Sequence, residues 1–223
     1  MYSTLDIGFI VLATLHPVLL HAAFPQRVRR MAAAADGRLR LYRQAMLRQW
    51  IPSLLLLALW RYEDHAWSAL GLAPPQGWRL PLGLTLIAAA LLASGIAEWR
   101  RRRISQSEAR ARLHKLLSAS AAEVLPRTGQ ELRWFHALSI TAGICEELIF
   151  RGAIVALLAP ATGLFAAYAI GVAAFGIGHA YQGPRGVAQT AIAGTVASGV
   201  VWLSGWLIPA MVLQALVDIN TGR

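Results

Sequence analysis

The sequence contains little charge and a single cysteine. Of its 223 residues only 14% are charged, against about 25% in an average soluble domain, whereas 57% are apolar. The lone cysteine, Cys145, excludes a disulfide within the chain and leaves the redox compartment undetermined. The low charge and the long apolar runs indicate a polytopic membrane protein rather than a soluble domain.

Acidic residues are also scarce, with 11 against 21 basic ones and a net charge of +10. Such an excess can indicate nucleic-acid binding. Here, however, 16 of the 21 positive charges lie in two segments between apolar runs, at 27–48 and 100–133, which is typical of topology signals. We therefore predict a lipid bilayer as partner and no nucleic acid. No basic residue precedes the first apolar run, so we expect an uncleaved first span.

The apolar runs predict an all-α fold: a polytopic bundle of about seven transmembrane helices, with amphipathic interfacial helices on the cytoplasmic surface. One of these is expected where the loop at 27–48 ends, and the other at 104–125. The chain divides into 1–124, a three-span part with two basic cytoplasmic loops, and 125–223, a four-span part. If both basic loops are cytoplasmic, the N-terminus lies outside and Arg185 lies inside. The predicted spans are about 5–24, 50–62, 81–99, 138–160, 161–179, 187–203 and 206–220.

The stretch SITAGICEELIFRG places three ionisable residues, Glu146, Glu147 and Arg151, inside an apolar helical run. Each costs about 2.5–3.5 kcal/mol on membrane-insertion scales, so such a cluster implies mutual pairing or chemistry. Glu147 and Arg151 are four residues apart and share a helix face. Glu146 points about 100° away from Glu147. Arg151 can therefore hold Glu147 ionised and leave Glu146 free to act.

Two further polar motifs fall on later spans: FGIGH, with Phe175 and His179, and QALVD, with Gln214 and Asp218. Taken singly, each of these residues fits a structural role. Together with Glu146 they are predicted to lie at a similar depth, near the cytoplasmic side. A carboxylate beside a neutral imidazole can activate water, and a glutamine N–H can stabilise an oxyanion. A protonated aspartic acid could donate in the same way.

These motifs, EExxxR, FxxxH and a terminal xxxD in this order, resemble the CAAX prenyl protease and bacteriocin-processing (CPBP) family of intramembrane proteases. The flanking sequences, LRWFHALSITAGICEELIFRG and GHAYQGPRG, look like bacterial members. The resemblance covers roughly 125–220, so the second part would be the catalytic core. It implies a multi-pass protein of the bacterial inner membrane and a CAAX protease-like hydrolase without a cofactor.

The resemblance also implies roles for individual residues. Glu146 would be the general base for water, helped by His179. Glu147 and Arg151 would organise the site, and Phe175 would contact the substrate, a peptide or protein at the membrane.

The last motif departs from the family pattern, which is usually HxxxN or HxxxD, because Gln214 stands at the histidine position and Asp218 at the second one. Glutamine keeps an N–H donor but cannot shuttle a proton or bind a metal as histidine does. With Glu146 and His179 as the main candidate ligands, a zinc site would lack the usual three protein ligands, so we expect no metal.

Three functions remain open on the sequence. The first is an intramembrane endopeptidase that cleaves a membrane-associated peptide, with Glu146 activating the water. The second, motivated by Gln214, is a non-catalytic scaffold or bacteriocin-immunity protein with the same fold. The third is a transporter or proton relay, which buried Glu and His would also suit. The sequence does not reveal the substrate, whether it is prenylated, or the oligomeric state.

Overall fold

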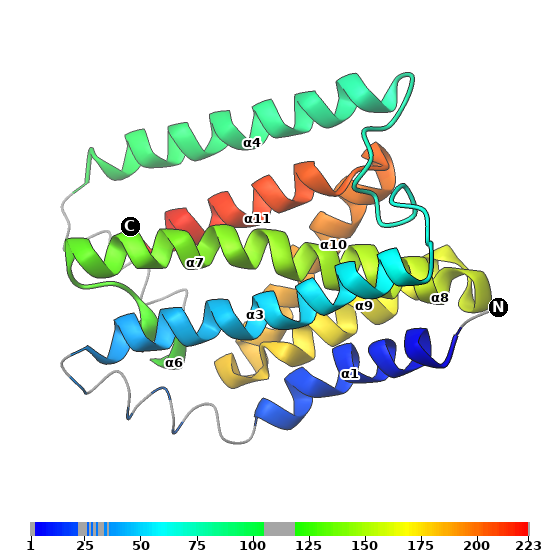
Figure 1. Ribbon diagram of the computed structural model, residues 1–223. Helices are drawn as coiled ribbons and strands as arrows, with labels where there is room; N and C mark the ends of the chain where they lie inside the picture. The colour runs from blue at the N-terminus through cyan, green and yellow to red at the C-terminus, as the bar shows by residue number, and fades with distance from the viewer. Residues whose placement is uncertain are drawn as a thin grey trace.

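The computed structural model describes residues 3–21, 26, 28, 30, 34, 36–104 and 119–222, and within these ranges every regular element is a helix (Figure 1). The all-α prediction is thus confirmed. The elements are α1 (Thr4–His21), α3 (Gly37–Tyr62), α4 (Arg79–Arg101), α6 (Ala119–Val124), α7 (Gly129–Glu147), the π-helix η1 (Leu148–Ala153), α8 (Ile154–Thr162), α9 (Leu164–Gly178), the 3₁₀ turn η2 (Ala180–Gln182), α10 (Gly183–Ser204) and α11 (Leu207–Thr221).

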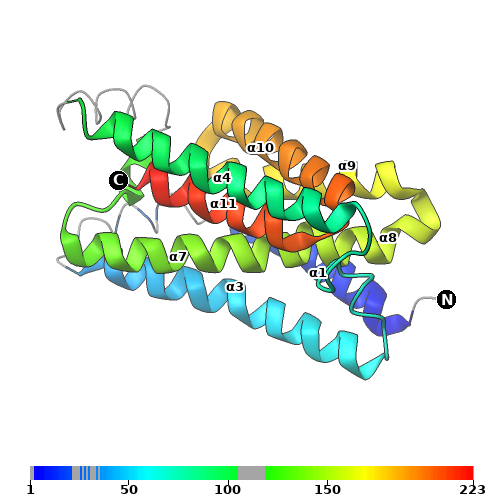
Figure 2. The same ribbon diagram turned by 90° about the horizontal axis from the view of Figure 1, so that it is seen from above.

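The longer helices run roughly along one common axis, as both ribbon views show (Figures 1 and 2). Helix α7 continues without a break through η1 into α8, and α3 and α11 both pack against it. Helix α4 lies at one edge, against α11 and α10. The connection between α3 and α4 lies at the end of the bundle where α1 begins, and the C-terminus lies at the opposite end (Figure 1).

Large apolar side chains cover much of the outer surface. On α3 they include Leu47, Leu54 and Leu55, and on α4 they include Leu84 and Leu92, each more than half exposed. Exposed apolar surface on this scale suits contact with lipid rather than water. Among the described residues, two segments are long and apolar enough to cross a membrane, 79–101 and 180–204. Each predicted span overlaps a helix, and the number of membrane crossings stays a prediction.

Local sequence signals explain where the helices of the second part begin and end. Thr128 caps α7: its hydroxyl accepts from the backbone N–H of Glu131, whose carboxylate accepts from the N–H of Thr128 in return. Gly163 separates α8 from α9, and Gly205 ends α10, with φ of 84° and 65° respectively. Such positive φ angles favour glycine, so the sequence encodes both reversals.

The basic segments differ from expectation in one respect. We predicted that 27–48 would be a loop leading into an interfacial helix, but Gly37–Tyr62 is one continuous helix. Its basic first turns lead directly into the apolar ones, and the helix continues through Pro52. The interfacial helix predicted at 104–125 lies mostly outside the described residues, which include α6 at its end.

Candidate functional site

The Glu146–Glu147 pair lies at the point where α7 becomes the π-helix η1. Glu147 is buried completely, and its Oε1 accepts a hydrogen bond of 2.7 Å from Nη1 of Arg151, which is 2% exposed. Glu146 is only partly buried. The two carboxylates therefore differ as the helical geometry predicts: Glu147 forms an internal ion pair, and Glu146 points in another direction.

The guanidinium of Arg151 has two further neighbours. It lies over the ring of Phe175, 4.2 Å from the centroid, in a cation–π contact. It also fills the space that a side chain at Gly194 of α10 would need, since a Cβ there would be 2.8 Å from Nη2. Arg151 is thereby fixed by η1, α9 and α10 together.

The carboxylate of Glu146 accepts hydrogen bonds from two amide side chains on different helices. Nε2 of Gln214, on α11, donates to Oε2 at 2.5 Å. Nε2 of Gln49, on α3, donates to Oε1 at 3.0 Å. Both donors are neutral, and both satisfy an ionised carboxylate, which can only accept. The structure thus brings Gln214 directly to Glu146, as the sequence motifs predicted.

His179 forms the C-terminal cap of α9, and its ring nitrogen Nδ1 is 2.9 Å from the carbonyl oxygen of Phe175. A carbonyl can only accept, so Nδ1 carries a hydrogen, and in the neutral ring Nε2 then has a lone pair. The imidazole packs edge-on against the Phe175 ring and lies near Tyr181, with centroid distances of 4.8 and 5.9 Å. It is close enough to Glu146 for the two groups to interact electrostatically.

The two other predicted site residues lie close by. Asp218, on α11 one turn beyond Gln214, is partly buried and within electrostatic range of Glu146. Phe175 is 5% exposed and packs against Arg151, His179 and Phe150. Its predicted substrate contact stays a prediction.

Small residues bring the helices of this site into close contact. A Cβ at Gly143 would be 2.6 Å from the carbonyl oxygen of Met211, so α7 and α11 approach each other here without a side chain between them. A Cβ at Gly171 of α9 would be 2.6 Å from the carbonyl oxygen of Phe150 in η1. These contacts set the distances between Glu146, Gln214 and His179.

Two residues of the site were missed by sequence reasoning. Gln49 directly precedes the second predicted span, 50–62, in the N-terminal part of the chain. Tyr181 belongs to the turn YQGPRG and lies within electrostatic range of Glu146 and Asp218. The available signal was the amide of Gln49 directly before an apolar run; nothing in the sequence links it to a glutamate 97 positions later.

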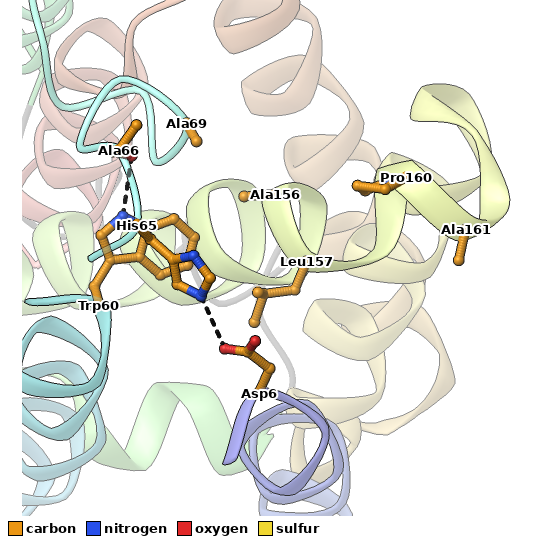
Figure 3. Close-up of a pocket in the computed structure, with 9 residues that line it drawn as sticks. All are labelled: Asp6, Trp60, His65, Ala66, Ala69, Ala156, Leu157, Pro160 and Ala161. Atoms are coloured by element: carbon orange, nitrogen blue, oxygen red, sulfur yellow. Dashed lines mark hydrogen bonds and ion pairs between the residues drawn. The ribbon is translucent and has the colours of Figure 1, made fainter. Parts of the chain in front are cut away.

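A separate pocket of about 360 Å³ lies between the start of α1, the end of α3, the following loop and α8 (Figure 3). Asp6 and His65 meet in it, with Oδ1 and Nε2 3.1 Å apart, and the His65 ring packs on Trp60. The pocket contains none of the predicted site residues. Within the described ranges, no three His, Cys, Asp or Glu side chains are grouped closely enough to hold a metal ion.

The helical bundle brings the amide of Gln214 to Glu146 and His179 into its vicinity, which is the arrangement expected from the resemblance to CAAX protease-like proteins. Residues 128–220 match the family model described as Rce1-like, type II CAAX prenyl endopeptidase. This segment is similar to a family of membrane proteases, and the match supports the resemblance to the CPBP family that the motifs indicated. No curated protein and no solved structure matches the chain.

Proposed function

We propose that the protein is an intramembrane endopeptidase that hydrolyses a peptide bond of a membrane-associated substrate, with its site near the cytoplasmic side of a bacterial inner membrane. The observation that carries this proposal is the environment of Glu146: a carboxylate of a partly buried residue, bonded to two amides and within electrostatic range of the His179 imidazole. The match of the surrounding segment to a protease family supports the same reading.

In this mechanism Glu146 takes a proton from a water molecule, whose oxygen attacks the carbonyl carbon of the substrate. The electron pair of the C=O bond moves onto its oxygen. When the tetrahedral intermediate collapses, the C–N bond breaks and the leaving amine takes the proton from Glu146. The lone pair on Nε2 of His179 can accept a hydrogen bond from the hydroxyl group of the tetrahedral intermediate and so stabilise it.

Gln214 has a second role in this proposal. Its NH₂ group has two hydrogens, of which one is directed at Oε2 of Glu146. The other can donate to the developing oxyanion, which is the function that the family's histidine would otherwise serve. Asp218, one turn further along α11, completes the polar wall on this side of the site.

The Glu147–Arg151 pair is assigned a positioning role. Both side chains are withdrawn from solvent, so neither can contact a substrate directly. Their bond joins the end of α7 to η1, and the contacts of Arg151 with Phe175 and Gly194 tie this junction to α9 and α10. The pair thus holds the backbone that carries Glu146.

The test is cleavage of a membrane-anchored peptide library by the purified protein in liposomes, read by mass spectrometry. Glu146→Gln and His179→Ala should each abolish the product of the wild-type protein, while Glu63→Gln, a control on the exposed α3–α4 loop, should leave it unchanged. Cleavage retained in both site variants would overturn the proposal.

The non-catalytic scaffold is the second candidate, and the observation that favours it is Gln214 where the family has histidine. A scaffold needs the fold but not the carboxylate. If Glu146→Gln is expressed at the normal level and fully supports the cellular phenotype of the gene, the scaffold is favoured; loss of the phenotype favours the peptidase.

A further inference from the structure

Helix α3, which belongs to the N-terminal part of the chain and not to the segment that matches the family, contributes a side chain to the proposed site. It packs along α7, and Gln49 is its partly buried residue at the level of Glu146. The 3.0 Å bond from Nε2 of Gln49 to Oε1 of Glu146 directly joins two residues that are 97 positions apart.

The other half of the Gln49 amide is unsatisfied. Its Oε1 atom is buried and has no hydrogen-bond partner among the described residues. A buried acceptor without a partner is unfavourable, so such atoms usually bind water or a ligand. Oε1 and Nε2 are attached to the same carbon, and Nε2 contacts the carboxylate of Glu146. A donor bound on the side of Oε1 that faces Nε2 can therefore also reach this carboxylate.

A water molecule satisfies both groups at once. One of its O–H bonds can point to Glu146, which is to accept the proton, and the other to Oε1 of Gln49. With both hydrogens engaged, the lone pairs of the oxygen point away from the two side chains and are free to attack a substrate carbonyl. The N–H bond from Nε2 meanwhile keeps the carboxylate from rotating.

We infer that Gln49 is a water-positioning residue of the proposed site: its N–H fixes the Glu146 carboxylate and its carbonyl oxygen accepts a hydrogen bond from the attacking water. This inference rests on the proposed function. It also means that the site is incomplete without α3, so the segment 128–220 would not suffice for cleavage.

If Gln49 only held α3 and α7 together, its loss would have other consequences than the loss of a residue that acts on Glu146. Loss of such a tie lowers stability and the amount of active protein, without changing how the remaining active protein depends on pH. Loss of a donor to an ionised carboxylate makes ionisation of that carboxylate less favourable. The acidic limb of the pH–rate profile therefore moves to higher pH only if Gln49 acts on Glu146.

Other titratable groups surround Glu146 and can also contribute to the pH–rate profile. Glu147 and Cys145 lie on α7, Arg151 on η1, His179 at the end of α9, Tyr181 on η2 and Asp218 on α11. None of them is changed by a substitution at position 49, so a shift between wild type and variant reports on the new environment of Glu146.

The decisive variant is Gln49→Met, which has a similar volume but neither donor nor acceptor. We expect kcat to fall about tenfold to a hundredfold, with KM within about twofold and the acidic limb displaced to higher pH. Gln44→Met, the same substitution on α3 but on another face of the helix, should match wild type in all three quantities. An unchanged kcat in folded Gln49→Met, or a lower kcat with an unmoved acidic limb, would overturn the inference.

A second measurement separates this inference from the proposed function. Isotope-edited infrared difference spectra, taken as wild type minus Glu146→Gln, report the ionisation of Glu146 without any cleavage. In Gln49→Met this titration should shift to higher pH. If the wild-type protein cleaves no peptide, the proposed function fails, and so does the water-positioning role of Gln49. An infrared shift in Gln49→Met would in that case still support the hydrogen bond between Gln49 and Glu146. If cleavage occurs and the spectra of wild type and Gln49→Met coincide, the inference alone fails.

Discussion

Glu147 and Arg151 form an ion pair that is closed to solvent, with 2.7 Å between Oε1 and Nη1, and they span the junction between α7 and the π-helix η1. Oε2 of Glu147 and two guanidinium nitrogens of Arg151 have no hydrogen-bond partner among the described residues. Each buried charge is therefore compensated mainly by the other, and removal of either partner leaves the second one as an unpaired buried charge.

The first prediction concerns this pair. Arg151→Met should destabilise the protein by about 3–5 kcal/mol, because it leaves an uncompensated carboxylate in the core. The double variant Glu147→Gln/Arg151→Met removes both charges and should recover most of that loss. Thermal unfolding of the purified proteins in detergent measures both values. The single variant Glu147→Gln completes the comparison. If the loss of stability in the double variant equals the sum of the losses in the two single variants, the pair is not coupled.

The same pair shows how far the sequence alone could lead. An i,i+4 spacing within an apolar run was sufficient to predict that Glu147 would bind Arg151 and that Glu146 would point elsewhere. The prediction succeeded because it required only the geometry of one helix. The π-helix that follows has no comparable local signal, and it was not predicted.

Contacts between distant helices were harder to predict. The order of the motifs and the depth expected from a positive-inside topology predicted that Gln214 and His179 would lie near Glu146. The same reasoning passed over Gln49, since depth alone cannot show which helix lies beside α7. That choice depends on the packing of small residues, such as the approach of α11 at Gly143, and packing of this kind is not visible in a hydropathy pattern.

The second prediction tests this close approach. In Gly143→Ala the added Cβ would meet the backbone of Met211 and the side chain of Ala215, neither of which can rotate away. We expect α11 to move outward, a loss of about 1–3 kcal/mol in stability, and a larger loss in cleavage as Gln214 leaves Glu146. Gly95→Ala on α4, where nothing lies within 4 Å, is the matched control and should be neutral or slightly stabilising. Equal behaviour of the two variants would contradict the prediction.

The third prediction addresses the departure from the family pattern. Gln214→Leu removes the donor to Oε2 of Glu146 and the proposed oxyanion donor together, so kcat should fall about a hundredfold or more. Gln214→His restores the residue usual in the family and keeps one ring N–H, so it should retain most of the activity. Steady-state cleavage of one identified peptide compares the two. A Leu variant as active as wild type would remove Gln214 from the mechanism.

The last prediction tests the membrane orientation on which the shared depth of the site residues depends. Because Cys145 is the single cysteine, Cys145→Ala provides a background without thiols. Into it we would place Ser68→Cys, in the exposed α3–α4 loop, or Arg185→Cys, exposed at the start of α10. Positive-inside topology puts the first outside the cell and the second in the cytoplasm. A membrane-impermeant maleimide should therefore label intact cells at position 68 at once, and at position 185 only after permeabilisation. Labelling in the reverse pattern would place the Glu146 site near the outer face and require a substrate that arrives from there.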